Sequence, residues 1–106
     1  MKLEVILGEQ VIPVEVRDEV VRGAGEVFAQ MDADMNQGIQ AGRYWIDMPD
    51  TLQRCQYVAN RLATALENED PPMQQMMAGY ILSRMPGVKR VAIDMQGEMQ
   101  LTEFDY

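Results

Sequence analysis

Histidine is absent from this chain of 106 residues, and serine and cysteine occur once each, as Ser83 and Cys55. Because histidine is the commonest general base and a common metal ligand, its absence removes the usual base of nucleophilic catalysis and a usual ligand of metal centres. A single cysteine excludes an internal disulfide bond, which fits a reducing compartment. We therefore expect a cytoplasmic protein that binds no cofactor, and we favour a non-catalytic role over an enzymatic one.

Basic residues are also few. The chain has 9 lysine and arginine residues against 17 aspartate and glutamate residues, which gives a formal net charge of −8. Residues 94–106 contain four acidic side chains and no basic one. Because binding to phosphate groups requires a basic face, this balance argues against nucleic acid and anionic membranes as partners.

Long apolar runs are missing as well. No stretch approaches the roughly 20 apolar residues that a membrane-spanning helix needs, and Met1-Lys2-Leu3-Glu4 does not lead into the apolar core of a secretion signal. Apolar residues make up 47% and charged residues 25%, which is typical of globular proteins. At this length we expect residues 1–106 to form a single α+β domain.

The first strands are predicted around Gly8. Two β-rich runs, residues 3–7 and 11–16, flank this glycine and indicate a hairpin. A two-residue loop would pair Val5 with Ile12, whereas a four-residue loop would pair Val5 with Val14 instead. Both registers keep apolar side chains on one face. Pro13 lacks an N–H group, so we expect the second strand to lie at an edge of its sheet or to turn that position to solvent.

Three helices are predicted in the middle of the chain. The first has Asp18 as its expected N-cap and carries the longest apolar repeat of helical period, with Gly38 and Gly42 as candidate stops. Its repeat comprises Val20, Ala24, Val27, Phe28, Met31, Met35 and Ile39.

The second helix starts at a capping box of Asp50 and Gln53, and the third at Asp70 followed by two prolines. The apolar stripe of the second helix comprises Leu52, Cys55, Ala59, Leu62 and Leu66.

A second hairpin is predicted at residues 88–106, with a three-residue loop at residues 96–98 that pairs Ile93 with Leu101. The chain then reads as an N-terminal hairpin, three helices and a C-terminal hairpin. Since an isolated hairpin is marginally stable, we expect the two to form one small antiparallel sheet with the helices on one face.

Asp32, Asp34 and Asn36 are the residues with the clearest chemical pattern. Alternating oxygen-bearing side chains resemble the start of a calcium loop of the EF-hand kind. Such a loop has glycine at its sixth place and glutamate at its twelfth, where this chain has Gln37 and Arg43. The same residues also lie within the helical repeat, where Asp32 and Asp34 would flank the apolar stripe on opposite sides. We favour the helix, and keep as alternatives a divalent-cation site or a metal-dependent carboxylate hydrolase that uses these three residues.

Ten methionines are present, and several lie on the third helix. Met73, Met76 and Met77, together with Tyr80, make an adaptable apolar face that suits either a core or protein recognition. Trp45 is a candidate interface anchor, because a rigid aromatic side chain gains much from burial. We therefore expect a small, acidic, non-catalytic interaction protein that binds a protein partner or itself as a homo-oligomer.

Overall fold

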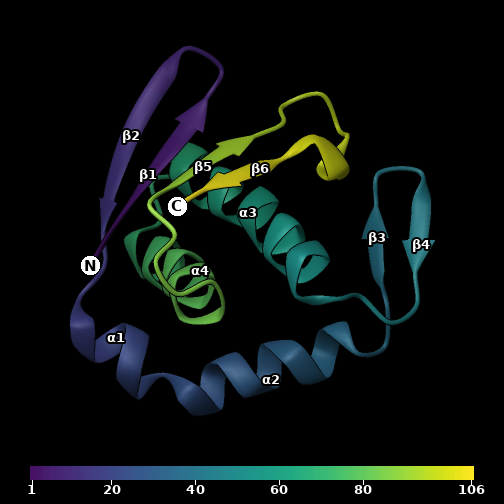
Figure 1. Cartoon of the computed structure of the whole chain (residues 1–106), viewed down its shortest axis with the longest axis horizontal. Coiled ribbons are helices and arrows are strands. Elements are labelled where there is room, and N and C mark those ends of the chain that lie inside the picture. The colour runs from purple at the N-terminus through teal and green to yellow at the C-terminus, as the bar shows by residue number, and fades with distance from the viewer.

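The computed structural model describes all 106 residues as a four-stranded sheet, a separate two-stranded hairpin and four α-helices (Figure 1). The elements in chain order are β1 (Lys2–Leu7), β2 (Gln10–Glu15), α1 (Asp18–Gly23), α2 (Gly25–Met35), β3 (Ile39–Ala41), β4 (Tyr44–Ile46), α3 (Thr51–Glu67), α4 (Pro71–Arg84), β5 (Arg90–Ile93), the 3₁₀ helix η1 (Met99–Leu101) and β6 (Glu103–Asp105).

The main sheet has the strand order β2-β1-β5-β6, and its central pair, β1 and β5, is parallel. The mixed α and β composition is confirmed, whereas the prediction of one wholly antiparallel sheet is wrong. The strand order follows from which strands are most apolar. Alternate residues of β1 and β5 are buried, so these strands take the centre, while β2 with its proline and β6 with its two acids take the edges.

The N-terminal hairpin has the two-residue loop. Val5 lies opposite Ile12 and Leu3 opposite Val14, and Gly8 in the turn has a φ of 61° that favours glycine. Pro13 lies in β2, an edge strand, as its missing N–H group predicts.

The C-terminal hairpin differs from its predicted register by one residue. Val91 lies opposite Phe104 and Ala92 opposite Glu103, and η1 occupies part of the connection. Asp94 stabilises the conformation of this connection. Its carboxylate accepts the N–H groups of Gln96 at 3.1 Å and Glu98 at 2.8 Å, which closes a local turn. The pattern of apolar residues could not reveal this, because side-chain hydrogen bonds fix the loop.

The single long helix predicted after Asp18 is also wrong. It is divided at Ala24 into α1 and α2, and α2 ends at Met35. Gly23 and Gly25 flank the break, and each costs a helix about 1 kcal/mol relative to alanine. Asp18 is the first residue of α1 and not its N-cap.

Residues 39–46 form the hairpin β3–β4, where the sequence patterns predicted only the end of the first helix, at Gly38 or Gly42. Gly38 allows the chain to leave α2, since its φ is 105° and a Cβ atom there would lie 2.3 Å from the ring of Trp45. The missed signal was the pair Gly42-Arg43 between the β-prone residues 39–41 and 44–46.

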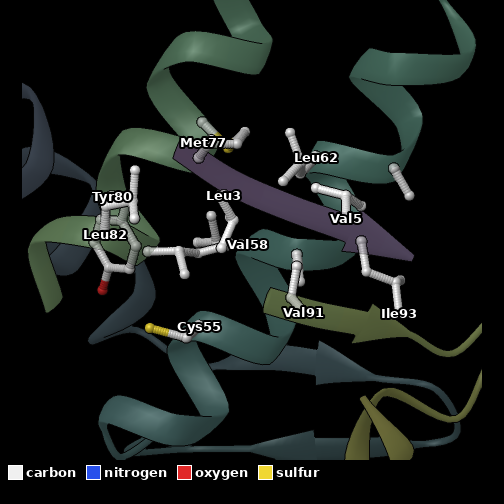
Figure 2. Close-up of a cluster of buried hydrophobic side chains, with 14 of the residues drawn as sticks. Leu3, Val5, Cys55, Val58, Leu62, Met77, Tyr80, Leu82, Val91 and Ile93 are labelled. Atoms are coloured by element: carbon white, nitrogen blue, oxygen red, sulfur yellow. The ribbon is translucent and has the colours of Figure 1, made fainter. Parts of the chain in front are cut away.

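The helices α3 and α4 begin as predicted. Asp50 and Gln53 form the capping box of α3, and the carboxylate of Asp70 accepts the N–H of Met73 at the start of α4. Both helices pack on the buried face of the sheet, and 24 buried residues form one hydrophobic cluster between them (Figures 1 and 2). Of the predicted stripe of α3, Leu52 is an exception, because it is 48% exposed.

Candidate functional site

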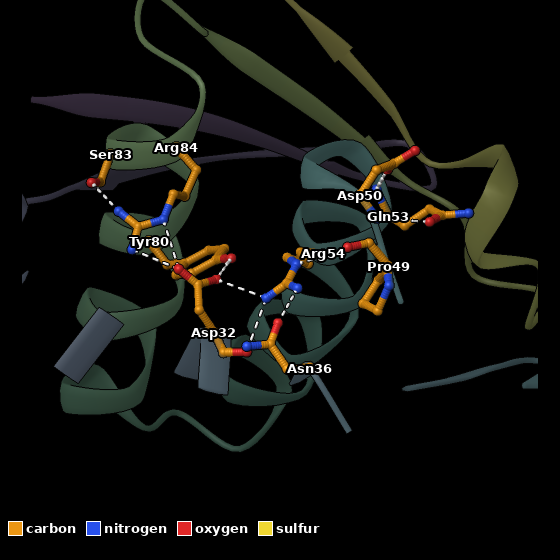
Figure 3. A network of polar contacts seen from close by, with 9 residues as sticks. All are labelled: Asp32, Asn36, Pro49, Asp50, Gln53, Arg54, Tyr80, Ser83 and Arg84. Atoms are coloured by element: carbon orange, nitrogen blue, oxygen red, sulfur yellow. Dashed lines mark hydrogen bonds and ion pairs between the residues drawn. The ribbon is translucent and has the colours of Figure 1, made fainter. Parts of the chain in front are cut away.

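Asp32 is the centre of a polar network that joins three helices (Figure 3). One carboxylate oxygen accepts the hydroxyl of Tyr80 and an N–H of Arg54 at 3.3 Å. The other oxygen accepts two N–H groups of Arg84, at 2.8 and 3.2 Å. Since Asp32 lies on α2, Arg54 on α3 and the other two on α4, this one carboxylate fixes α2 against both helices.

The network is held in its charged form. Burial opposes ionisation of Asp32, but the hydrogen bonds from Tyr80 and Arg84 and the two positive charges outweigh it and lower the pKa of the carboxyl below its usual value. Burial and the bond to Asp32 raise the pKa of the Tyr80 phenol, so this hydroxyl remains a donor. The cluster has one more positive than negative charge and is complete without a cation.

The three residues of the predicted cation site are brought only partly together. The side-chain oxygen of Asn36 accepts an N–H of Arg54, so Asn36 and Asp32 share a partner as expected for residues four apart on a helix. Asp34 takes no part and accepts instead from Gln30 at 3.0 Å. Residues 32–35 are helical, and no group of three or more histidine, cysteine or acidic side chains is placed to hold a metal ion. The geometry therefore gives the cation-site hypothesis no support.

The methionine face of α4 serves mainly as core. Met77 and Tyr80 are buried, while Met73 and Met76 are half-buried against the hydrophobic cluster. Tyr80 also packs edge-on against the ring of Phe28, with 5.9 Å between the ring centroids. Little of this face remains for a partner.

Trp45 is the exception among the predicted partner-binding residues. It is 57% exposed on β4, its ring covers Gly38, and its indole N–H donates to Asp47 at 2.8 Å.

The two residue types that are scarce in the sequence offer no nucleophile. The Cys55 thiol is fully buried on α3, and burial raises its pKa to about 12. The hydroxyl oxygen of Ser83 accepts an N–H of Arg84 at 3.1 Å. The Ser83 hydroxyl donates to no side chain that could act as a general base.

A groove of about 430 Å³ lies between the start of α3 and β6. Its apolar lining comes from Leu52 on α3, Met85 after α4, Phe104 on β6 and Tyr106 after β6. Gln56 also lines it, and its buried side-chain amide donates to the carbonyl oxygen of Thr102 at 3.1 Å. The lining residues are Leu52, Gln56, Met85, Gln100, Thr102, Glu103, Phe104 and Tyr106.

Exposed apolar side chains accumulate around this groove. Tyr106, which lines the groove, is 66% exposed, and Leu101, which lies between the lining residues Gln100 and Thr102, is 60% exposed. A smaller hollow, of about 280 Å³, between the tip of β3–β4 and the loop at residues 96–98 shares Gln100 with the groove and adds the exposed Tyr44. The sequence patterns missed these residues, although the acidic, base-free segment 94–106 marked the region.

Comparison with protein-family models, with curated proteins and with solved structures found no match. No helix combines the length and apolar character needed to cross a membrane. Function must therefore be inferred from the geometry of the surface and its cavities.

Proposed function

We propose that this protein is a non-catalytic protein-interaction domain whose docking surface is the groove between α3 and β6. The observation that carries this proposal is the combination of apolar walls with an edge strand. β6 pairs only with β5, so its other side has no strand partner, and the groove lies between β6 and α3. An extended segment can add to such an edge through its main chain while its side chains enter adjoining pockets.

The partner's chemistry follows from charge. Residues 94–106 carry four acidic side chains and no basic one, and Glu103 lines the groove itself. A partner segment that alternates apolar with lysine or arginine side chains would match both the walls and the carboxylates. A second copy of this chain matches less well, because each copy has a net charge of −8. The expected homo-oligomer is therefore the competing proposal.

Selection from a library of short random peptides, followed by fluorescence polarisation, tests this proposal. Enriched peptides are expected to combine apolar with basic residues and to bind more weakly as salt rises from about 0.05 to 0.3 M. Leu52→Lys is expected to weaken them at least about tenfold, because it replaces an apolar lining residue with a charge that repels a basic peptide. Val11→Lys is the matched control, since Val11 is similarly exposed (55%) but lies on β2 at the opposite edge.

Two results would overturn the proposal. Peptides that bind the Leu52 and Val11 variants equally would show that the groove is not the docking surface. Light scattering that gives a dimer in the wild type and a monomer only in the Leu52 variant would assign the groove to a second copy of the chain.

A further inference from the structure

A smaller cavity, of about 170 Å³, lies between α2, β3, α3 and α4, away from the groove. Four buried apolar residues line it: Met35, Ile39, Val58 and Met77. They come from four different elements, so the cavity exists only in the folded chain. Asp34 and Arg61, both exposed, line it as well.

Size limits what the cavity accepts. A cavity of about 150 Å³ lined by apolar side chains holds benzene, whereas sites for drug-sized ligands and cofactors measure about 300–1,000 Å³. The space therefore fits one aliphatic or aromatic group the size of an amino-acid side chain. Methionine walls adapt to the shape of such a group.

The two charged residues of the cavity are not paired with each other. Arg61 lies one helical turn after Val58 on α3. Its side chain forms no ion pair and no hydrogen bond. Asp34 accepts one hydrogen bond, from Gln30 through Oδ1, which leaves Oδ2 without a partner. Arg54 and Asp32 on the same two helices differ, since they bind each other at 3.3 Å. The cavity thus offers one cation and one carboxylate to a ligand.

We propose that this cavity binds a free apolar α-amino acid. The ligand carboxylate would pair with Arg61, its ammonium group with Asp34, and its side chain would fill the space between Met35 and Met77. A simple carboxylic acid would meet repulsion from Asp34, and a simple amine would meet repulsion from Arg61. Only a zwitterion satisfies both. This site is separate from the α3–β6 groove, so the proposal does not depend on the proposed function.

Titration of ¹⁵N-labelled protein with L-leucine, L-methionine and L-phenylalanine, followed by amide NMR shifts, tests the site. At least one of the three is expected to give saturable shifts at Gly38 and Ile39. Arg61→Gln and Asp34→Asn are each expected to weaken that ligand at least about tenfold, as loss of a charge-assisted contact predicts. Arg22→Gln on α1 is the matched control, since Arg22 is exposed and lies outside the cavity.

Two ligand analogues separate the zwitterion from other ligands of the same shape. N-acetylleucine lacks the ammonium group and leucinamide lacks the carboxylate, so each is expected to bind at least about tenfold more weakly than leucine. Equal binding of N-acetylleucine, or unchanged binding in the Arg61 variant, would overturn the proposal. Absence of saturable shifts with all three amino acids would also overturn it.

Discussion

Asp32→Asn is the most informative single substitution, because one carboxylate holds α2 against α3 and α4. The change keeps the size of the side chain but removes the charge that Arg54 and Arg84 share. It also replaces one acceptor oxygen with an N–H₂ donor, so one set of donors loses its acceptor and both arginines lose their shared counter-charge.

The magnitude follows from partial burial. Side-chain exposure is 29% for Asp32, 15% for Arg54 and 30% for Arg84, so the cluster is neither fully buried nor at the open surface. Breaking a buried ion pair costs about 3–5 kcal/mol, whereas a surface pair contributes about 0–1 kcal/mol. We expect a loss of about 2 kcal/mol in the free energy of unfolding, and a fall in Tm of roughly 8–15 °C.

Urea denaturation followed by circular dichroism measures this loss, and Asp34→Asn is the control. Asp34 lies on the same helix, is exposed, and has Gln30 as its one hydrogen-bond partner. Its substitution is expected to change the free energy of unfolding by no more than about 0.5 kcal/mol.

The effect of Asp32→Asn has a predictable pH dependence. The pKa of Asp32 is lowered in the folded protein from 3.8, so its contribution to stability is complete above about pH 4 and is lost as the pH falls through the folded-state pKa. The gap between wild type and the Asn variant is therefore expected to narrow below about pH 4. A gap that stays constant down to pH values well below this, or an Asp34 variant as unstable as the Asp32 variant, would refute the network as a source of stability.

Three further predictions concern the fold. Gly38→Ala is expected to cost about 2–4 kcal/mol in chemical denaturation, because the new Cβ atom stands at a positive φ and also collides with the ring of Trp45. Gly8→Ala also has a positive φ but open space around it, so it is expected to cost only about 1 kcal/mol, and equal costs would contradict the close packing at Gly38. Leu62→Ala is expected to lower the free energy of unfolding by about 3 kcal/mol and Leu52→Ala by less than about 1 kcal/mol, although both belong to the same predicted stripe; the reverse order would contradict the fold. Cys55 is expected to react with a thiol reagent at pH 8 only as fast as the protein unfolds, and rapid labelling of the native protein would show that the thiol is accessible.

Local sequence signals predicted the elements whose shape depends on near neighbours. The capping box at Asp50 and Gln53 and the Asp70 cap before two prolines fix the starts of α3 and α4 within a few residues of chain. The turn at Gly8 fixes the first hairpin in the same way.

Features that depend on distant parts of the chain were not predictable from those signals. The parallel pairing of β1 with β5 depends on which apolar strands occupy the centre of the sheet, and these two strands are more than 80 residues apart in the sequence. The division of the first predicted helix at Ala24 was missed for a local reason. The apolar repeat of helical period continues across Gly23 and Gly25, although the helix is interrupted between them. The partners of Asp32 are 22, 48 and 52 residues away, so its pattern with Asp34 and Asn36 suggested a cation instead.

Substitutions at Asp32 and Asp34 distinguish the stability of the fold, to which Asp32 contributes, from the proposed amino-acid binding, which involves Asp34. Both are acidic, two residues apart on α2, but one contacts two arginines and a tyrosine while the other faces a cavity with an unpaired arginine. If both assignments are correct, Asp34→Asn weakens amino-acid binding at unchanged stability. Asp32→Asn lowers stability and weakens binding only as far as α2 shifts against the cavity walls on α3 and α4. A large loss of binding in the Asp32 variant with none in the Asp34 variant would mean that the cavity depends on the position of the helix and not on the Asp34 charge.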